Sequence, residues 1–107
     1  MTGQNSQILQ PDQCSSMAEL RSEIDRLDRS LVRLLSQRQR YIERAAEIKS
    51  QASDIRDEGR VQEVLAKVEA EAGRCNLDAG LARAVWQTLV ERSIALEFAA
   101  FEAQRSR

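Results

Sequence analysis

The chain has 107 residues, 31% of them charged and 42% hydrophobic, and its net charge is −1. This length suits one modest domain, and the near-neutral charge argues against general affinity for nucleic acid. No apolar run could span a membrane and no secretory signal pattern is present, so we expect a cytoplasmic protein that does not bind membranes.

The first 15 residues, which hold the only proline, are expected to form a flexible N-terminal tail before one helical domain at residues 16–107. The segment Ser16-Met17-Ala18-Glu19 is a capping box that predicts the start of the first helix. Residues 16–50 lack Gly and Pro, and their apolar side chains recur in a coiled-coil-like heptad rhythm. These apolar positions form a stripe that we call the seam: Met17, Leu20, Ile24, Leu27, Leu31, Leu34, Tyr41, Ala45 and Ile48. One position of this rhythm holds Arg38, whose guanidinium must find an anion or face water.

The predicted first helix is too long for a lone small domain. It would run about 50 Å at 1.5 Å per residue, whereas a compact chain of this size has a radius of gyration of about 13 Å. We therefore expect two copies to cross antiparallel along their seams as a homodimer. If they cross between Arg33 and Leu34, residue n of one chain lies opposite about residue 67 − n of the other.

Two shorter helices are expected to follow the first. Residues 51–56 read as a loop, and Asp57 is a plausible N-cap for a second helix with the apolar stripe Val61, Val64, Leu65 and Val68. Gly73 could end that helix in the left-handed conformation. The third helix would start at a cap on Asn76 or Asp78. It is apolar on most sides, which predicts burial through much of its length. The few turn residues, 4 Gly and 1 Pro, agree with an all-α, three-helix protomer.

Three cations of the first helix could surround one small dianion. Arg38 and Lys49 lie about three helical turns apart and share a face. In the antiparallel pair, Arg21 of the second chain would lie opposite about residue 46, between these two cations. Twofold symmetry would make two such pockets, each able to hold one small dianion.

The other predicted elements add further polar candidates. The loop and the first turn of the second helix offer Arg56, Asp57 and Arg60, at a helix N-terminus that favours anions. The third helix offers Ser93 and Glu97, four residues apart on one face. A carboxylate on such an apolar helix needs a partner or a proton.

Simpler interpretations of these residues stay open. Arg38 could fix the register of the seam, Lys49 and Arg60 could be solvated surface charges, and Arg21 could pair with Asp25. Glu97 could pair with Arg92 or Arg105 instead of contacting a ligand. The chain could accordingly be a non-catalytic helical dimer that acts as a binding or regulatory partner.

Histidine is absent, which removes Ser-His and Cys-His catalysis and the commonest zinc ligand. Cys14 and Cys75 have no metal-ligand spacing, so we expect two reduced thiols and no metal site. An enzyme built from this chain would work mainly with arginine, lysine and carboxylates.

Three segments resemble the all-helical class of chorismate mutases: ELRSEIDRLDRSLVRLLSQRQRYIERAAEIK, then IRDEGRVQEVL, then LDAGLARAVWQTLVERSIALE. The resemblance implies intertwined three-helix protomers in which Arg38 and Lys49 bind the substrate in cis and Arg21 binds it in trans. It also implies that Arg60 binds a carboxylate and that Asp57 lies near the ring hydroxyl. Ser93 and Glu97 fall at the family's third-helix site positions.

The resemblance implies an isomerase of the shikimate pathway and of aromatic amino acid biosynthesis, which converts chorismate to prephenate without a cofactor. Lys49, Glu97 in its protonated form and Arg38 would be the catalytic residues. Two positions depart from the family pattern. Val61 stands where several mutases carry Glu and where the related isochorismate-pyruvate lyases carry an apolar residue, and Glu97 stands where many members carry Gln. A lyase giving salicylate and pyruvate, or a mutase of amino-deoxychorismate, therefore stays an alternative.

Overall fold

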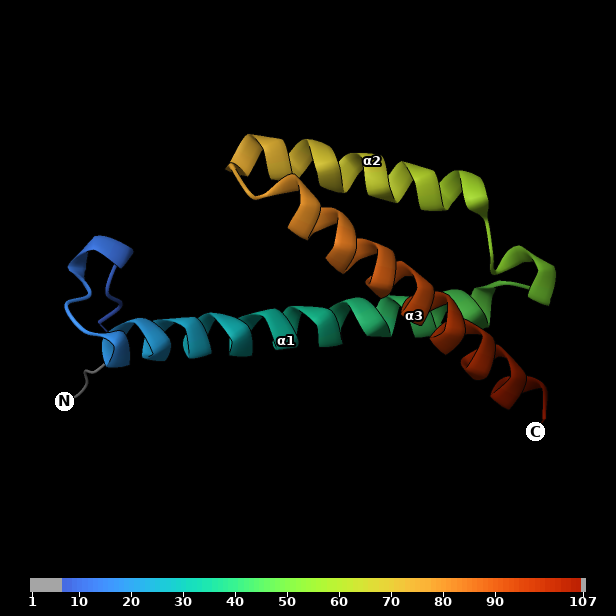
Figure 1. The fold of residues 1–107 in the computed structure, drawn as a ribbon. Coiled ribbons are helices and arrows are strands. Elements are labelled where there is room, and N and C mark those ends of the chain that lie inside the picture. The colour runs from blue at the N-terminus through green and yellow to red at the C-terminus, as the bar shows by residue number, and fades with distance from the viewer. Residues whose placement is uncertain (1–6, 107) are drawn as a thin grey trace. The chain divides into compact units, whose positions relative to one another are not determined.

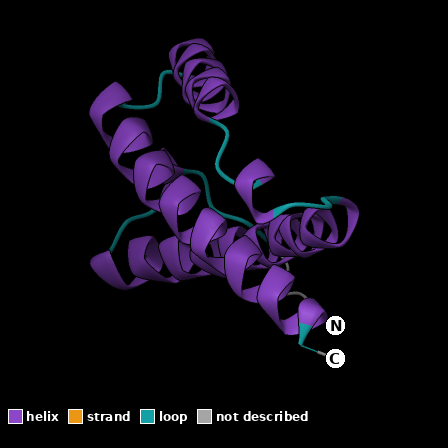
Figure 2. Ribbon diagram, turned by 90° about the vertical axis from the view of Figure 1, so that its right-hand side faces the viewer, coloured by secondary structure: helices purple, strands orange, loops and turns teal. Residues whose placement is uncertain are grey.

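The computed structural model describes residues 7–106, and every regular element in this range is helical (Figures 1 and 2). The predicted all-α fold with three main helices is confirmed. These helices are α1 (Met17–Ile48), α2 (Glu58–Cys75) and α3 (Ala79–Arg105), with short 3-10 turns η2 (Pro11–Gln13) and η3 (Ala52–Asp54). Within the described range, no helix combines the length and the apolar character needed to cross a membrane.

The chain divides into two compact units, Met1–Arg38 and Gln39–Arg107, and the boundary falls inside α1. In the first unit, the backbone N–H of Glu19 donates to the Ser16 hydroxyl over 3.1 Å, as the capping box predicts. The return contact differs, because the Glu19 carboxylate accepts from the N–H of Ser15, at 2.7 Å, and not from that of Ser16. The start of α1 is therefore fixed by two serines.

Residues 7–15 differ from the loose tail that we expected. Pro11 opens a 3-10 turn, and the N–H of Gln10 donates to the Gln13 side chain over 2.7 Å. The N–H of Leu9 donates to the Glu23 carboxylate over 3.3 Å, which ties this segment to α1. Residues 1–6 of the predicted tail lie outside the described residues.

The seam of α1 is exposed in the single chain. Among its members, only Leu20 and Ala45 are half-buried. Tyr41 and Ile48, at its C-terminal end, keep 78% and 69% of their surface exposed. Such a row of exposed large apolar side chains is unusual for a surface that faces only water.

In the second unit, α2 and α3 run in opposite directions from a short turn (Figure 1). Asp57 caps α2, as the sequence predicts. Asp78 caps α3 and is one of the two caps expected for that helix. The prediction that Gly73 ends α2 is wrong. The helix continues to Cys75, and Asn76 takes the left-handed conformation with φ 58°. Asparagine tolerates this conformation better than most residues.

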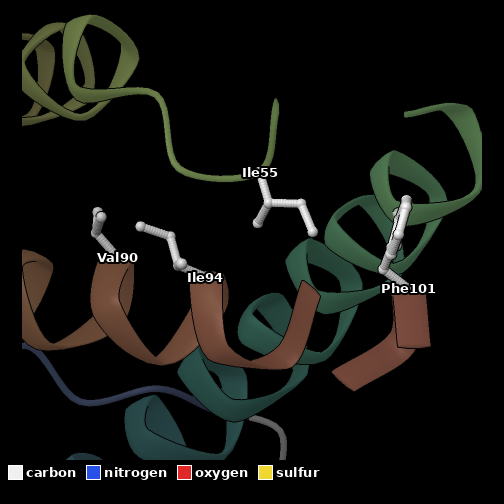
Figure 3. Close-up of a cluster of buried hydrophobic side chains, with 5 residues drawn as sticks. Ile55, Val90, Ile94 and Phe101 are labelled. Atoms are coloured by element: carbon white, nitrogen blue, oxygen red, sulfur yellow. The ribbon is translucent and has the colours of Figure 1, made fainter. Parts of the chain in front are cut away.

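The core of the second unit joins α1, α3 and the loop before α2. Figure 3 shows Ile55 from the loop pointing toward Val90, Ile94 and Phe101 of α3. Ala46 of α1 completes this cluster and is fully buried. The expected burial of most of α3 is wrong, because Leu81, Val85, Leu96 and Phe98 are exposed. Neighbours within the unit cover only one side of α3, the side that carries the cluster.

Candidate active site

A buried ion pair joins the end of α1 to the middle of α3. The Nζ atom of Lys49 lies 2.6 Å from Oε2 of Glu97, whose side chain is only 7% exposed. Lys49 directly follows the last residue of α1, and its backbone N–H continues the helical pattern by donating to Ala45. A charged carboxylate at this depth is stable only with such a partner. Of the partners considered from the sequence, neither Arg92 nor Arg105 takes this place.

The contact leaves hydrogen-bonding capacity at Glu97. Although Oε2 lies close enough to Lys49 for an ion pair, the angles are not those of a hydrogen bond, and this buried atom accepts none from the described residues. Ser93 is buried one turn earlier on the same face of α3. The Lys49 side chain is 29% exposed, so the lysine side of the pair is not sealed from solvent. The pair can therefore meet a ligand that brings both an acceptor and a donor.

Arg105 holds the backbone that carries Lys49. One of its terminal nitrogens donates to the carbonyl oxygens of Lys49 and Ser50, at 3.3 and 3.1 Å. The guanidinium also lies 4.3 Å from the ring centroid of Phe101, a cation–π distance. A cation near the last carbonyls of a helix also favours the helix dipole. The sequence analysis did not assign this role, although Arg105 lies four residues after Phe101 on α3.

A forked ion pair fixes the loop between α1 and α2. The two terminal nitrogens of Arg56 lie 2.6 and 3.2 Å from the two carboxylate oxygens of Glu91 on α3. This guanidinium holds the pKa of Glu91 below its usual value. Ile55, the preceding residue, is buried in the core. The loop is therefore attached to α3 both by an apolar anchor and by a bidentate pair of the stronger type.

Asp57 and Arg60 lie at the N-terminus of α2 but do not contact the Lys49–Glu97 pair. The Asp57 carboxylate accepts from the backbone N–H of Arg60 over 3.1 Å, as the N-cap. The Arg60 side chain is exposed and pairs with Glu63 at 2.6 Å, which lowers the pKa of that carboxyl. Because it is an exposed pair on one helix, the contact stabilises little and can be exchanged for a ligand carboxylate.

Val61 is half-buried and packs against the core cluster. This position suits an apolar side chain. Val61 therefore has a packing role in the second unit, independent of any contact with a ligand.

Arg21 and Arg38 both lie on the part of α1 that belongs to the first unit. Arg38 is half-buried. Arg21 is exposed, and neither Asp25 nor another carboxylate of residues 7–106 forms an ion pair with it. The simpler interpretation of Arg21 as the partner of Asp25 is therefore wrong for the single chain.

No group of three or more cysteine, aspartate or glutamate side chains in the described part of the chain could hold a metal ion. Cys14 and Cys75 are free thiols, as expected. What the second unit does bring together is a buried carboxylate and an ammonium, whereas the Arg60 guanidinium on α2 pairs with Glu63 and does not contact them. The ammonium can donate a hydrogen bond to an anionic molecule without a nucleophile.

Two comparisons with known proteins bear on this site. No curated protein matches the chain closely enough to count as a relative. A family model described as chorismate mutase type II matches residues 20–98, from the second turn of α1 to the residue after Glu97.

Proposed function

The chain belongs to the type II chorismate mutase family, and we propose that it converts chorismate to prephenate in a cationic pocket shared between two protomers. The observation that carries this proposal is the Lys49–Glu97 pair. It places the ammonium of Lys49 2.6 Å from the buried carboxyl of Glu97. These are the two residues that the family resemblance assigns to the reacting end of the substrate.

The proposed reaction is a unimolecular rearrangement, in which the ether C–O bond breaks while a new C–C bond forms. It requires no nucleophile, metal or cofactor, which suits a chain without histidine. The enzyme must hold the dicarboxylate in its compact form, which is catalysis by positioning. Lys49 would donate a hydrogen bond to the ether oxygen as negative charge develops there.

Arginines would hold the two substrate carboxylates. Arg38 of the same chain and Arg60 are suited to bidentate binding, and Arg60 would exchange Glu63 for the substrate. Arg21 would come from the second protomer, opposite about residue 46 in the antiparallel register. Asp57 and Ser93 would bind the polar groups of the ring end, and the product would feed aromatic amino acid biosynthesis.

The assay that tests the function uses purified protein with chorismate and, separately, with isochorismate. We expect prephenate from chorismate. Salicylate and pyruvate from isochorismate would instead identify a lyase. Consumption of neither substrate, with amino-deoxychorismate also unchanged, would contradict an enzymatic role and favour a helical dimer that binds a partner.

The proposed homodimer is supported by the exposed seam of α1. Two copies crossing along it would cover Leu27, Leu31 and Leu34 near the middle of the helix, each of which is more than half exposed in the single chain. We expect sedimentation to show a dimer whose unfolding depends on protein concentration, with no stable folded monomer. A folded monomer at every concentration would contradict both the dimer and the trans role of Arg21.

The lyase alternative is favoured by Val61, which is apolar as in the lyases. Val61→Glu should raise the ratio of kcat/KM for chorismate to that for isochorismate, because a carboxylate could accept a hydrogen bond from the ring hydroxyl. Since Val61 packs against the core, Val61→Met, which is of similar length to Glu but has only a weak acceptor, serves as the control for lost packing. An unchanged ratio in a folded Val61→Glu protein would remove this position as a determinant of specificity.

A further inference from the structure

A mostly apolar cavity lies between residues 8–14 and the first turns of α1, entirely within the first unit. Its volume is about 260 Å³, compared with about 150 Å³ for an engineered cavity that holds benzene. It therefore has room for an aromatic ring. Its apolar lining comes from Ile8, Leu9, Pro11, Cys14, Leu20, Ile24 and Leu27.

Three of these seven residues belong to the seam. Leu20, Ile24 and Leu27 are seam positions, and Ile24 and Leu27 remain 52% and 51% exposed although residues 8–14 lie beside them. Ile8, on the opposite wall, is 48% exposed. Residues 8–14 thus widen the apolar surface beside the seam and do not cover it.

The proposed antiparallel register would bring one particular side chain to this cavity. Tyr41 of a second copy would lie opposite about residue 26, between Ile24 and Leu27. Tyr41 is 78% exposed, more than any other large hydrophobic side chain of the described residues. A buried tyrosine also needs a partner for its hydroxyl, and the cavity offers the Glu23 carboxylate, which accepts from Leu9 and Arg26.

We infer that residues 8–14 form a dimerisation arm, which together with Leu20, Ile24 and Leu27 makes a socket for the partner's Tyr41. The inference rests on the homodimer of the proposed function. Twofold symmetry gives one socket at each end of the crossing. Arg21 directly follows the socket residue Leu20, so the seated tyrosine would also fix the turn of α1 that carries the trans cation.

A double-mutant cycle on the dimer dissociation constant tests the socket. Ile8→Ala and Tyr41→Ala should each weaken the dimer by about tenfold or more, since each removes apolar burial at two symmetric sites. Combined, they should weaken it by clearly less than the product of the single effects, because the two side chains touch. Leu34→Ala, on the seam at the crossing point, is the matched control, and it should combine additively with Ile8→Ala.

The two thiols provide a second measurement that does not depend on weakening the dimer. Cys14 lines the socket, whereas Cys75 is exposed on α2 and serves as an internal reference. At concentrations where each protein is dimeric, Tyr41→Ala should raise the alkylation rate of Cys14 relative to Cys75 severalfold. Leu34→Ala should leave this ratio unchanged.

Additive effects of Ile8→Ala and Tyr41→Ala, or an unchanged Cys14 ratio in Tyr41→Ala, would show that the arm serves only its own helix. A tighter dimer in Ile8→Ala would show that the arm competes with the partner. Each of these results would overturn the inference. None of them depends on turnover, so a dimer with a coupled socket that leaves chorismate unchanged would refute the proposed function and keep the arm.

Discussion

Equal amounts of Arg21→Ala and Arg38→Ala protein, mixed and allowed to exchange subunits, are expected to recover about a quarter of the unsubstituted activity. Each variant alone should be nearly inactive, because every site then lacks one of the cations that hold the substrate. Random exchange makes half of the dimers mixed. In a mixed dimer, one site takes Arg38 from the Arg21→Ala chain and Arg21 from the Arg38→Ala chain, so it is complete. The other site lacks both arginines.

The control mixture combines Arg38→Ala with Lys49→Ala. Both residues are proposed to act in the site of their own chain, so each site of a mixed dimer keeps one defect and no activity should return. Initial rates of prephenate formation and mass spectrometry of the mixed dimers are the measurements. Mixed dimers that form without recovering activity in the first mixture would place Arg21 in the site of its own chain.

The second large effect is expected at Glu97. An ionised carboxylate only accepts hydrogen bonds, so beside an ether oxygen that gains negative charge it would oppose the transition state. Glu97→Gln keeps the shape and offers an N–H donor at every pH. We expect it to raise kcat/KM at neutral pH by on the order of tenfold.

The geometry supplies the competing outcome for this experiment. Because Lys49 lies 2.6 Å from Glu97, the carboxylate could act by orienting the ammonium. In that case Glu97→Gln would abolish activity at every pH while the fold survives. Lys49→Met is the companion variant and should lower kcat/KM by about 10²- to 10³-fold, as the loss of one donor to a developing charge does. Loss of Lys49 leaves the buried Glu97 carboxylate without its partner, which lowers the free energy of unfolding by about 3–5 kcal/mol. The folding of Lys49→Met is therefore checked by comparison with the Lys49→Met/Glu97→Gln double variant.

The three helices are predictable from the sequence, because the signals that start them act within a few residues. Ser16, Asp57 and Asp78 cap the three helices through contacts with backbone groups three positions ahead. The heptad rhythm of α1 needs no tertiary information either. The same local reasoning failed at the end of α2, where Asn76 and not Gly73 takes the left-handed conformation. Both residues can adopt it, so propensity alone does not choose between them.

Which charged side chains pair with one another depends on how the helices pack. From the sequence, Glu97 had nearby arginines on its own helix, but burial against the end of α1 brings Lys49 to it instead. Arg105 reaches the carbonyls of Lys49 and Ser50, and Arg56 reaches Glu91, because packing sets these distances across elements. The attachment of Leu9 to Glu23 escaped the sequence analysis for the same reason. A charged side chain can pair with any opposite charge that the fold places within reach, and burial raises the free-energy cost of leaving that charge unpaired.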